Sequence, residues 1–248
     1  MEKRNIYEQT FKVYSYFVDD NRKLILSNLM YFMQEAAWAH ANNNQFGWHF
    51  LQTKNMFWAL VKLHIHIERM PEWNESIHLK TWGKNPELII YPRDFEIFDE
   101  EGNRIIAATS AWVILNKENF KPQKVTPENE TNMILDKHAI QGKIPKIPKI
   151  DIPSSNIYHR VLHSDIDMNK HVNNTRYLMW ILDEYGHDFH QQHVLKTCNI
   201  HFISQAKYGD EYSIVKKQTA AHSYISSIFS RQGNTEVCRV ALDWKSNN

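Results

Sequence analysis

The sequence has 248 residues with 29 Lys and Arg against 28 Asp and Glu, so its formal charge of +1 implies no nucleic acid or other partner attracted by net charge. Its 42% hydrophobic and 23% charged residues are ordinary for a globular protein of one or two domains. The seven glycines lie at least 19 residues apart. This spacing excludes phosphate-binding loops, dinucleotide fingerprints and nucleophile elbows, because each needs glycines within about five residues of one another.

The first residues contain acids and no apolar core of a signal peptide. The least charged stretch, Leu24 to Gln52, is interrupted by Glu35 and by many amide side chains, which a bilayer would not accept. We therefore expect a cytoplasmic protein without a membrane span. Cys198 and Cys238 have no CxxC spacing and alternate with apolar residues, which predicts buried, unreactive thiols. We assign no metal and no other cofactor.

The first predicted elements are a short strand over Phe11 to Val18 and then a helix, whose apolar residues recur at helical spacing. These residues are Leu29, Phe32, Met33 and Ala36, with further apolar residues beside them that suggest a helix surrounded by protein. Strands follow, each with alternating apolar and polar residues, as in half-buried antiparallel sheets. The aromatic residues after the helix either line a tunnel for an apolar ligand or fill the core; they are Phe46, Trp48, Phe50, Phe57 and Trp58.

A proline-rich stretch over residues 121–155 reads as a linker between two domains. Within it, the run from Lys143 to Ile150 repeats Lys-Ile-Pro every three residues, which is the period of polyproline II. The lysines are therefore expected along one edge and the isoleucines along another. We interpret this run as a stiff strap that lies on the domains by its isoleucines.

The two flanking segments look like copies of one unit. An offset of 146 residues aligns four identical pairs: Asp19 with Asp165, Asn28 with Asn174, Tyr31 with Tyr177, and Met33 with Met179. A second opening strand is expected over Asn156 to His163. The predicted organisation is a first unit over residues 1–120, the linker over 121–155 and a second unit over 156–248. The fold class is α+β, with two antiparallel sheets each wrapped around a long central helix.

The densest polar run of the second unit lies between its first strand and its helix, and contains Asp167, Asn169 and His171 at alternating positions. In an extended loop all three side chains would project to one side. Such a trio combines a carboxylate that activates water, an amide that holds a carbonyl and an imidazole that moves protons near neutral pH. Backbone N–H groups at the helix start would stabilise an oxyanion.

The offset of 146 places Asn21, Lys23 and Ile25 opposite the trio, so the first unit is expected to lack it. The structural alternative is that Asn173 or Asn174 caps the helix and that the aspartates form Asx turns. That alternative leaves the histidine unexplained.

The run from Ser164 to Tyr177 resembles the signature of the tandem hot dog thioesterases that hydrolyse acyl-acyl carrier protein. Leu26 to Ala37 and Ala111 to Val113 are similar to the N-terminal half of that family. The resemblance implies a double hot dog fold whose first unit forms the acyl pocket. It also implies fatty acid biosynthesis as the setting and a carrier protein bearing an acyl-phosphopantetheine thioester as the partner, and it allows a homodimer.

By position, the catalytic aspartate, asparagine and histidine of that family fall on Asp167, Asn169 and His171. The family glutamate, and the cysteine that follows it in plant members, fall on Gln205 and Ala206. Glutamine is no general base and alanine is no nucleophile. The resemblance therefore leaves Asp167 to activate water with the help of His171, gives Gln205 at most an orienting role, and excludes a cysteine mechanism.

Three alternatives stay open at this point. The His-Val-Asn-Asn run is shared with hot dog acyl-CoA thioesterases, so coenzyme A is a second candidate carrier. A hot dog hydratase acting on enoyl or 3-hydroxyacyl thioesters is another enzyme of the same fold. A non-catalytic acyl-binding module is motivated by the departures at Gln205 and Ala206.

Overall fold

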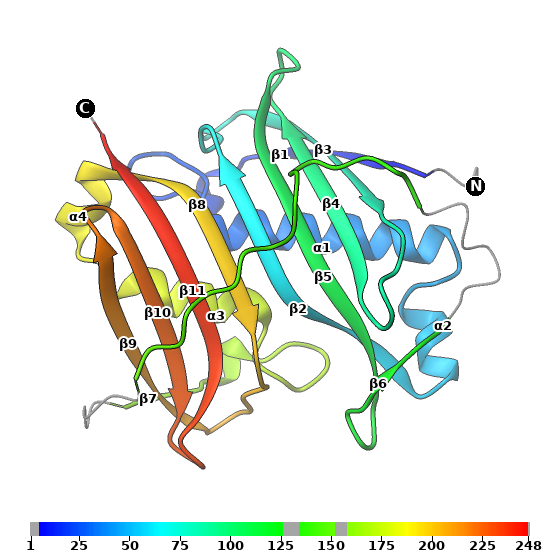
Figure 1. The fold of residues 1–248 in the computed structure, drawn as a ribbon. Coiled ribbons are helices and arrows are strands. Elements are labelled where there is room, and N and C mark those ends of the chain that lie inside the picture. Colours follow the sequence, from blue (N-terminus) through cyan, green and yellow to red (C-terminus); the bar gives the residue numbers. More distant parts are fainter. Residues whose placement is uncertain (1–4, 126–133, 152–157, 248) are drawn as a thin grey trace. The chain divides into compact units, whose positions relative to one another are not determined.

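The structure is a computed structural model that describes residues 5–125, 134–151 and 158–247 (Figure 1). It divides into two compact units, Met1–Ile144 and Pro145–Asn248. The boundary falls within the segment predicted as a linker, so one part of that segment belongs to each unit. No helix in the described part of the chain is long and apolar enough to cross a membrane.

The first unit is an antiparallel sheet with a long helix across one face (Figure 1). Its elements are β1 (Tyr7–Lys12), the short 3-10 helix η1 (Ser15–Phe17), α1 (Leu26–Asn43), α2 (Trp48–Thr53), β2 (Met56–Ile67), β3 (Ser76–Gly83), β4 (Tyr91–Phe98), β5 (Arg104–Asn116) and β6 (Pro122–Gln123). The strands lie in the order β1-β3-β4-β5-β2, and β6 pairs with β5.

The second unit repeats this plan with a shorter helix. Its elements are β7 (His159–Arg160), the 3-10 helix η3 (His163–Asp165), α3 (Asn174–Asp183), α4 (His187–Gln192), β8 (His193–Phe202), β9 (Glu211–Ala220), β10 (Ser223–Ser230) and β11 (Thr235–Ser246). The strands lie in the order β8-β11-β10-β9-β7, and all neighbours are antiparallel.

Neither predicted opening strand has the bounds that the sequence pattern indicated, since β1 begins at Tyr7 and overlaps the predicted range only at Phe11 and Lys12. In the first unit the strand ends at Lys12, because the chain turns into η1, where the Phe17 N–H donates to the Tyr14 carbonyl at 3.0 Å. In the second unit only β7 is regular strand before η3, and Asn156 lies outside the described residues. Each unit therefore reaches its helix through a 3-10 turn and a loop.

The helix α1 places Leu29, Met30 and Met33 in the core against the sheet. One side of the helix faces solvent, since Trp38 is 49% exposed, so the expectation of a helix surrounded by protein is wrong there. Three of the five aromatic residues after the helix, Phe46, Phe50 and Trp58, belong to one core cluster. Phe46 packs with Leu51 and Ile114, and partly buried side chains close around them: Phe50, Met56, Trp58, Tyr91 and Val125.

In the second unit the proline-rich strap has the predicted alternation. Ile147 is buried and Ile150 half-buried, while Lys146 and Lys149 are exposed. Polar side chains of the sheet also hold the strap backbone, because Arg239 Nη1 donates to the Ile147 carbonyl at 2.8 Å. The strap is therefore part of the folded unit.

In the first unit, a buried carboxylate anchors the segment that follows the last strand. Asp94 is 0% exposed and accepts a hydrogen bond from the Ala139 N–H at 2.8 Å through Oδ2. Its Oδ1 lies 2.8 Å from Lys84 Nζ, which is itself only 12% exposed. Trp82 Nε1 adds a bond to the Lys137 carbonyl at 2.9 Å. Asp94 therefore compensates a buried cation and holds a distant segment at the same time.

We expect the substitution Asp94→Ala to lower the free energy of unfolding by about 3–5 kcal/mol, because it leaves the Lys84 ammonium buried without its carboxylate. Urea unfolding followed by tryptophan fluorescence measures the change. The matched control is Asp136→Ala, which removes an exposed carboxylate from the same segment and should change stability by less than about 0.5 kcal/mol. Equal effects of the two substitutions would contradict the anchoring role.

Candidate active site

The polar trio lies on a tight turn that precedes α3. Ile166 and Val172 form an antiparallel bridge, the Asp167 N–H donates to the His171 carbonyl at 2.9 Å, and the Lys170 N–H donates to the Asp167 carbonyl at 3.0 Å. Lys170 has a φ of 66°, in the left-handed region that lets the chain reverse within so few residues. The expectation of an extended loop with three side chains on one side is therefore wrong.

The Asp167 carboxylate closes this turn. Its Oδ1 accepts hydrogen bonds from the Asn169 N–H at 2.8 Å and from the His171 N–H at 3.4 Å, and Asn169 Nδ2 lies 3.5 Å from its Oδ2. Asn173 caps the helix, since its Oδ1 accepts from the Thr175 N–H at 3.0 Å. The structural alternative is thus confirmed for Asp167 and Asn173. The same bonds bring all three residues of the trio into one turn.

The same turn occurs in the first unit, ahead of α1. Asp19 Oδ1 accepts from the Asn21 N–H at 3.0 Å and from the Lys23 N–H at 2.9 Å. The Asp19 N–H donates to the Lys23 carbonyl at 2.9 Å, and Arg22 is left-handed with a φ of 60°. The helix caps, Ile25 and Asn173, occupy the same step of the chain. The two bonds to the aspartate Oδ1 and the backbone bonds within the turn have counterparts in both units, so the two turns are equivalent at an offset of 148 residues.

This register corrects the offset of 146 for the turn and the helix. Asp167 and Asn169 correspond to Asp19 and Asn21, and His171 corresponds to Lys23 rather than to Ile25. The first unit therefore keeps the aspartate and the asparagine, which the turn itself needs. The histidine is the member of the trio that the first unit lacks.

A second substitution accompanies the histidine. In the first unit the Leu24 N–H donates to the Pro71 carbonyl at 2.8 Å, and the next residue, Glu72, forms an ion pair with Lys23. In the second unit the equivalent bond joins the Val172 N–H to the Ala206 carbonyl at 3.0 Å, so Lys207 takes the place of Glu72. An ion pair in one unit thus corresponds to an imidazole beside a cation in the other.

The surroundings of His171 favour its neutral form. Burial is the largest influence and lowers the pKa of the half-buried imidazole, and the Lys207 ammonium lowers this pKa further. The Asp167 carboxylate acts in the opposite direction but does not reverse the shift. Because an unperturbed histidine has a pKa of about 6.5, the ring is neutral and able to accept a proton at neutral pH.

Two buried contacts that the sequence analysis missed hold the turn in place. Asp165 is 3% exposed, and its carboxylate accepts from Arg176 Nε at 2.7 Å and from the Leu162 N–H at 2.8 Å. The Tyr177 hydroxyl accepts from the Ala206 N–H at 3.0 Å, and burial raises the pKa of this hydroxyl well above its usual range. The helical spacing of buried residues along α3 would have indicated Tyr177, whereas no local pattern in the sequence indicated Asp165.

Gln205 is exposed and directly precedes Ala206, which is 3% exposed and borders the turn. The orienting role of Gln205 stays a prediction. Both cysteines are fully buried, as predicted, and burial raises the pKa of each thiol. Among the described residues, no group of three or more His, Cys, Asp or Glu side chains is arranged to hold a metal ion.

Comparison with known proteins identifies the family. Residues 4–133 match the model of the acyl-ACP thioesterase N-terminal domain, and residues 151–246 match that of the acyl-ACP thioesterase C-terminal domain. The chain belongs to the acyl-ACP thioesterase family. The resemblance inferred from the sequence is thereby confirmed, and this acyl-ACP thioesterase family member is a thioester hydrolase.

Relatives and solved structures agree with this assignment. The oleoyl-acyl carrier protein thioesterase 2 of Arabidopsis thaliana is 25% identical, over 95% of this chain and 69% of that protein. An acyl-acyl carrier protein hydrolase of Cuphea viscosissima is 26% identical, over 98% of this chain and 63% of its own length. The acyl-ACP thioesterase from Bacteroides thetaiotaomicron is 25% identical with a TM-score of 0.88, covering 97% of this chain and 98% of its own.

The 12:0-ACP thioesterase from Umbellularia californica shares the fold, with a TM-score of 0.87 at 21% identity over 98% of both chains. Together with the Bacteroides structure it confirms the predicted double hot dog architecture of two antiparallel sheets, each with a central helix.

The His171 environment leads to a pH prediction. Lys207→Glu replaces a cation that lowers the His171 pKa with an anion that raises it, as Glu72 faces Lys23 in the first unit. The protonated fraction of the ring at a given pH then rises, so the acidic limb of the pH profile of kcat/KM should move up by about one pH unit. Lys245→Glu, which makes the same charge change at an exposed residue of β11, is the control. If the acidic limb of Lys207→Glu stayed at its wild-type pH, the result would contradict the view that the protonation of His171 produces this limb.

Proposed function

We propose that this chain hydrolyses fatty acyl-acyl carrier protein to a free fatty acid and the carrier thiol at the turn formed by residues 167–171. One observation supports placing the reaction at this turn. The two units contain the same hydrogen-bonded turn, and only the second places an imidazole with a lowered pKa in it. A neutral imidazole is the side chain best suited to accept a proton from water at neutral pH.

The hydrogen bonds of Asp167 change the catalytic roles that the sequence suggested for Asp167 and His171. Asp167 Oδ1 already accepts hydrogen bonds from two backbone N–H groups, so this oxygen is engaged in holding the turn. We therefore assign proton transfer to His171. Asp167 stabilises the imidazolium that forms and holds the turn.

The reaction then proceeds in two steps. The His171 ring accepts a proton from water as the water oxygen bonds to the thioester carbon, and the carbonyl electron pair moves onto oxygen. The oxyanion then reforms the carbonyl, the C–S bond breaks, and the imidazolium gives its proton to the thiolate. The products are a carboxylic acid and a thiol, with no group left on the protein.

Asn169 is the side chain placed to donate to the oxyanion. It is exposed, and its Nδ2 makes only a long contact of 3.5 Å with Asp167, so this amide can turn toward a substrate. The backbone donors at the helix start are less available than the sequence suggested. The Thr175 N–H bonds to the Asn173 side chain, and the Arg176 N–H bonds to the Asn173 carbonyl at 2.9 Å.

The family favours acyl carrier protein over coenzyme A as the carrier, because relatives across nearly the whole chain are named for acyl-acyl carrier protein thioesters. We place the reaction in fatty acid biosynthesis, at the point where a finished acyl chain leaves its carrier.

The substitution His171→Ala should lower kcat for acyl-acyl carrier protein by about 10²–10⁴-fold, which is the usual contribution of a positioned acid or base. The control is Lys23→Ala, which removes the side chain at the equivalent position of the first unit and should leave kcat within about twofold. Thiol release measured with a colorimetric thiol reagent gives both rates. A folded His171→Ala or Asp167→Ala variant with the wild-type rate would contradict the proposed site.

The same assay separates the alternatives. Hydration of an enoyl thioester removes its conjugated absorbance without releasing a thiol, whereas hydrolysis releases one equivalent of thiol. Binding of acyl thioesters without thiol release at any chain length would favour an acyl-binding module. Equal kcat/KM for acyl-acyl carrier protein and acyl-CoA would remove the preference for the carrier protein.

A further inference from the structure

The helix α1 carries an amide side chain in the apolar interior of the first unit. Gln34 lies in the middle of α1, and the offset of 148 residues pairs it with Leu182 of α3. Both residues are half-buried at the same step of their helices. The second unit thus places a leucine where the first has a glutamine, so this position of the fold does not itself require an amide.

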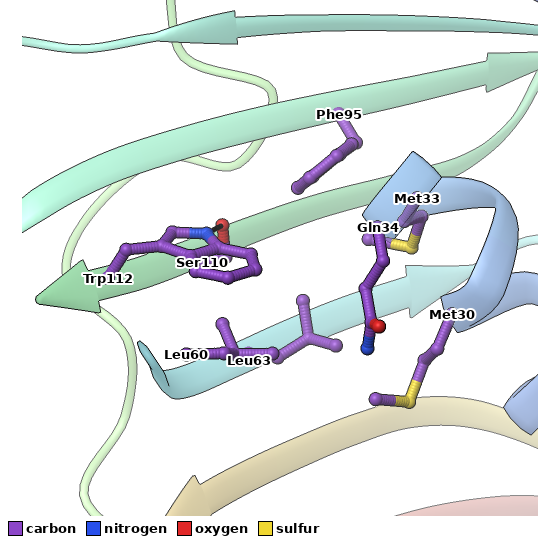
Figure 2. A pocket seen from close by; sticks show the side chains of 8 residues that line it. All are labelled: Met30, Met33, Gln34, Leu60, Leu63, Phe95, Ser110 and Trp112. Carbon is purple, nitrogen blue, oxygen red and sulfur yellow. Dashed lines mark hydrogen bonds between the residues drawn. The ribbon is translucent and has the colours of Figure 1, made fainter. Parts of the chain in front are cut away.

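The surroundings of Gln34 are largely apolar. It borders a small cavity of about 10 Å³ between α1 and the strands β2, β4 and β5 (Figure 2). The other lining residues are Met30, Met33, Leu60, Leu63, Phe95, Ser110 and Trp112. Figure 2 shows the Gln34 side chain extending from the helix with its amide directed toward β2. A cavity of this volume has room for about one water molecule.

The Gln34 amide nitrogen is buried and has no hydrogen-bond partner among the described residues. The other polar group of the cavity has its partners, because Ser110 Oγ accepts from Trp112 Nε1 at 2.9 Å and donates to the Arg93 carbonyl at 3.0 Å. A buried amide donor without a partner is costly, and a leucine at the same position would avoid that cost. Because this open donor belongs to a residue that lines the cavity, an acceptor atom of a bound molecule can reach it there.

We propose that Gln34 binds an oxygen atom of the acyl thioester substrate and is a substrate-recognition residue of this enzyme. The inference rests on the proposed function, since it takes the acyl thioester as the ligand. The acceptor is a hydroxyl or keto oxygen on the acyl chain. Entry of a chain enlarges the cavity by movement of Met30 and Met33, whose unbranched side chains change rotamer readily.

The test is the substitution Gln34→Leu, which introduces the residue of the second unit. Its matched control is Gln141→Leu, which makes the same amide-to-leucine change at an exposed residue of the same unit that does not line the cavity. Both variants and the wild type are assayed for kcat/KM on acyl-acyl carrier protein and on 3-hydroxyacyl-acyl carrier protein of equal chain length. Melting temperatures of the three free proteins are measured alongside.

Gln34→Leu should lower kcat/KM about tenfold for the 3-hydroxyacyl substrate. The unsubstituted acyl substrate should keep its kcat/KM or be hydrolysed faster, so an equal loss on both substrates would contradict the proposal. The melting temperature should stay equal or rise, because a buried donor without a partner has been removed, and Gln141→Leu should leave both kcat/KM values unchanged.

Unchanged kcat/KM on both substrates would overturn the proposal, and so would a loss accompanied by a fall in melting temperature, which would mark a structural role. The wild-type rates separate this outcome from a failure of the proposed function. A wild type that hydrolyses neither substrate contradicts the function itself, whereas an active wild type with an unaffected Gln34→Leu variant contradicts only the role of Gln34.

Discussion

The site depends on one interaction, in which an aspartate carboxylate accepts hydrogen bonds from the backbone N–H groups two and four residues further along the chain. In both units these bonds fold the chain between the first strand and the helix, at Asp19 and at Asp167. Because the aspartate carboxylate accepts both hydrogen bonds within the turn, the residue four positions later is held at a fixed place beside the helix start. The turn therefore fixes the position of that residue, which is Lys23 in the first unit and His171 in the second.

The two units use that place differently. In the first, Lys23 pairs with Glu72, and opposite charges neutralise each other at the surface, which contributes little beyond local order. In the second, partial burial and Lys207 both lower the pKa of His171, so the imidazole stays neutral beside the Asp167 carboxylate. The two turns thus differ at two positions, because Lys23 and Glu72 of the first unit are replaced by His171 and Lys207 in the second. The ion pair between the buried Asp165 and the half-buried Arg176 also holds the second turn in place.

Much of the architecture could be predicted from the sequence, because periodicity reports burial directly. The tandem units, their antiparallel strands and the strap with Ile147 inward all follow from such patterns. The register between units could not be predicted, since four identities favoured an offset that pairs Asp19 with Asp165. Hydrogen bonds, rather than identities, show that Asp19 corresponds to Asp167. Likewise, nothing in the sequence placed Lys207 beside His171, because that proximity arises from a loop joining a distant strand.

The pKa of His171 in the intact wild-type enzyme tests the central claim most directly. A proton NMR titration, with the ring signal assigned by its absence in a His171→Asn variant, measures this pKa without any substrate. The account predicts a pKa clearly below the usual value of about 6.5 for histidine. A value at or above 6.5 would show that the ring is not held neutral by its surroundings, and would contradict the contrast between the two turns.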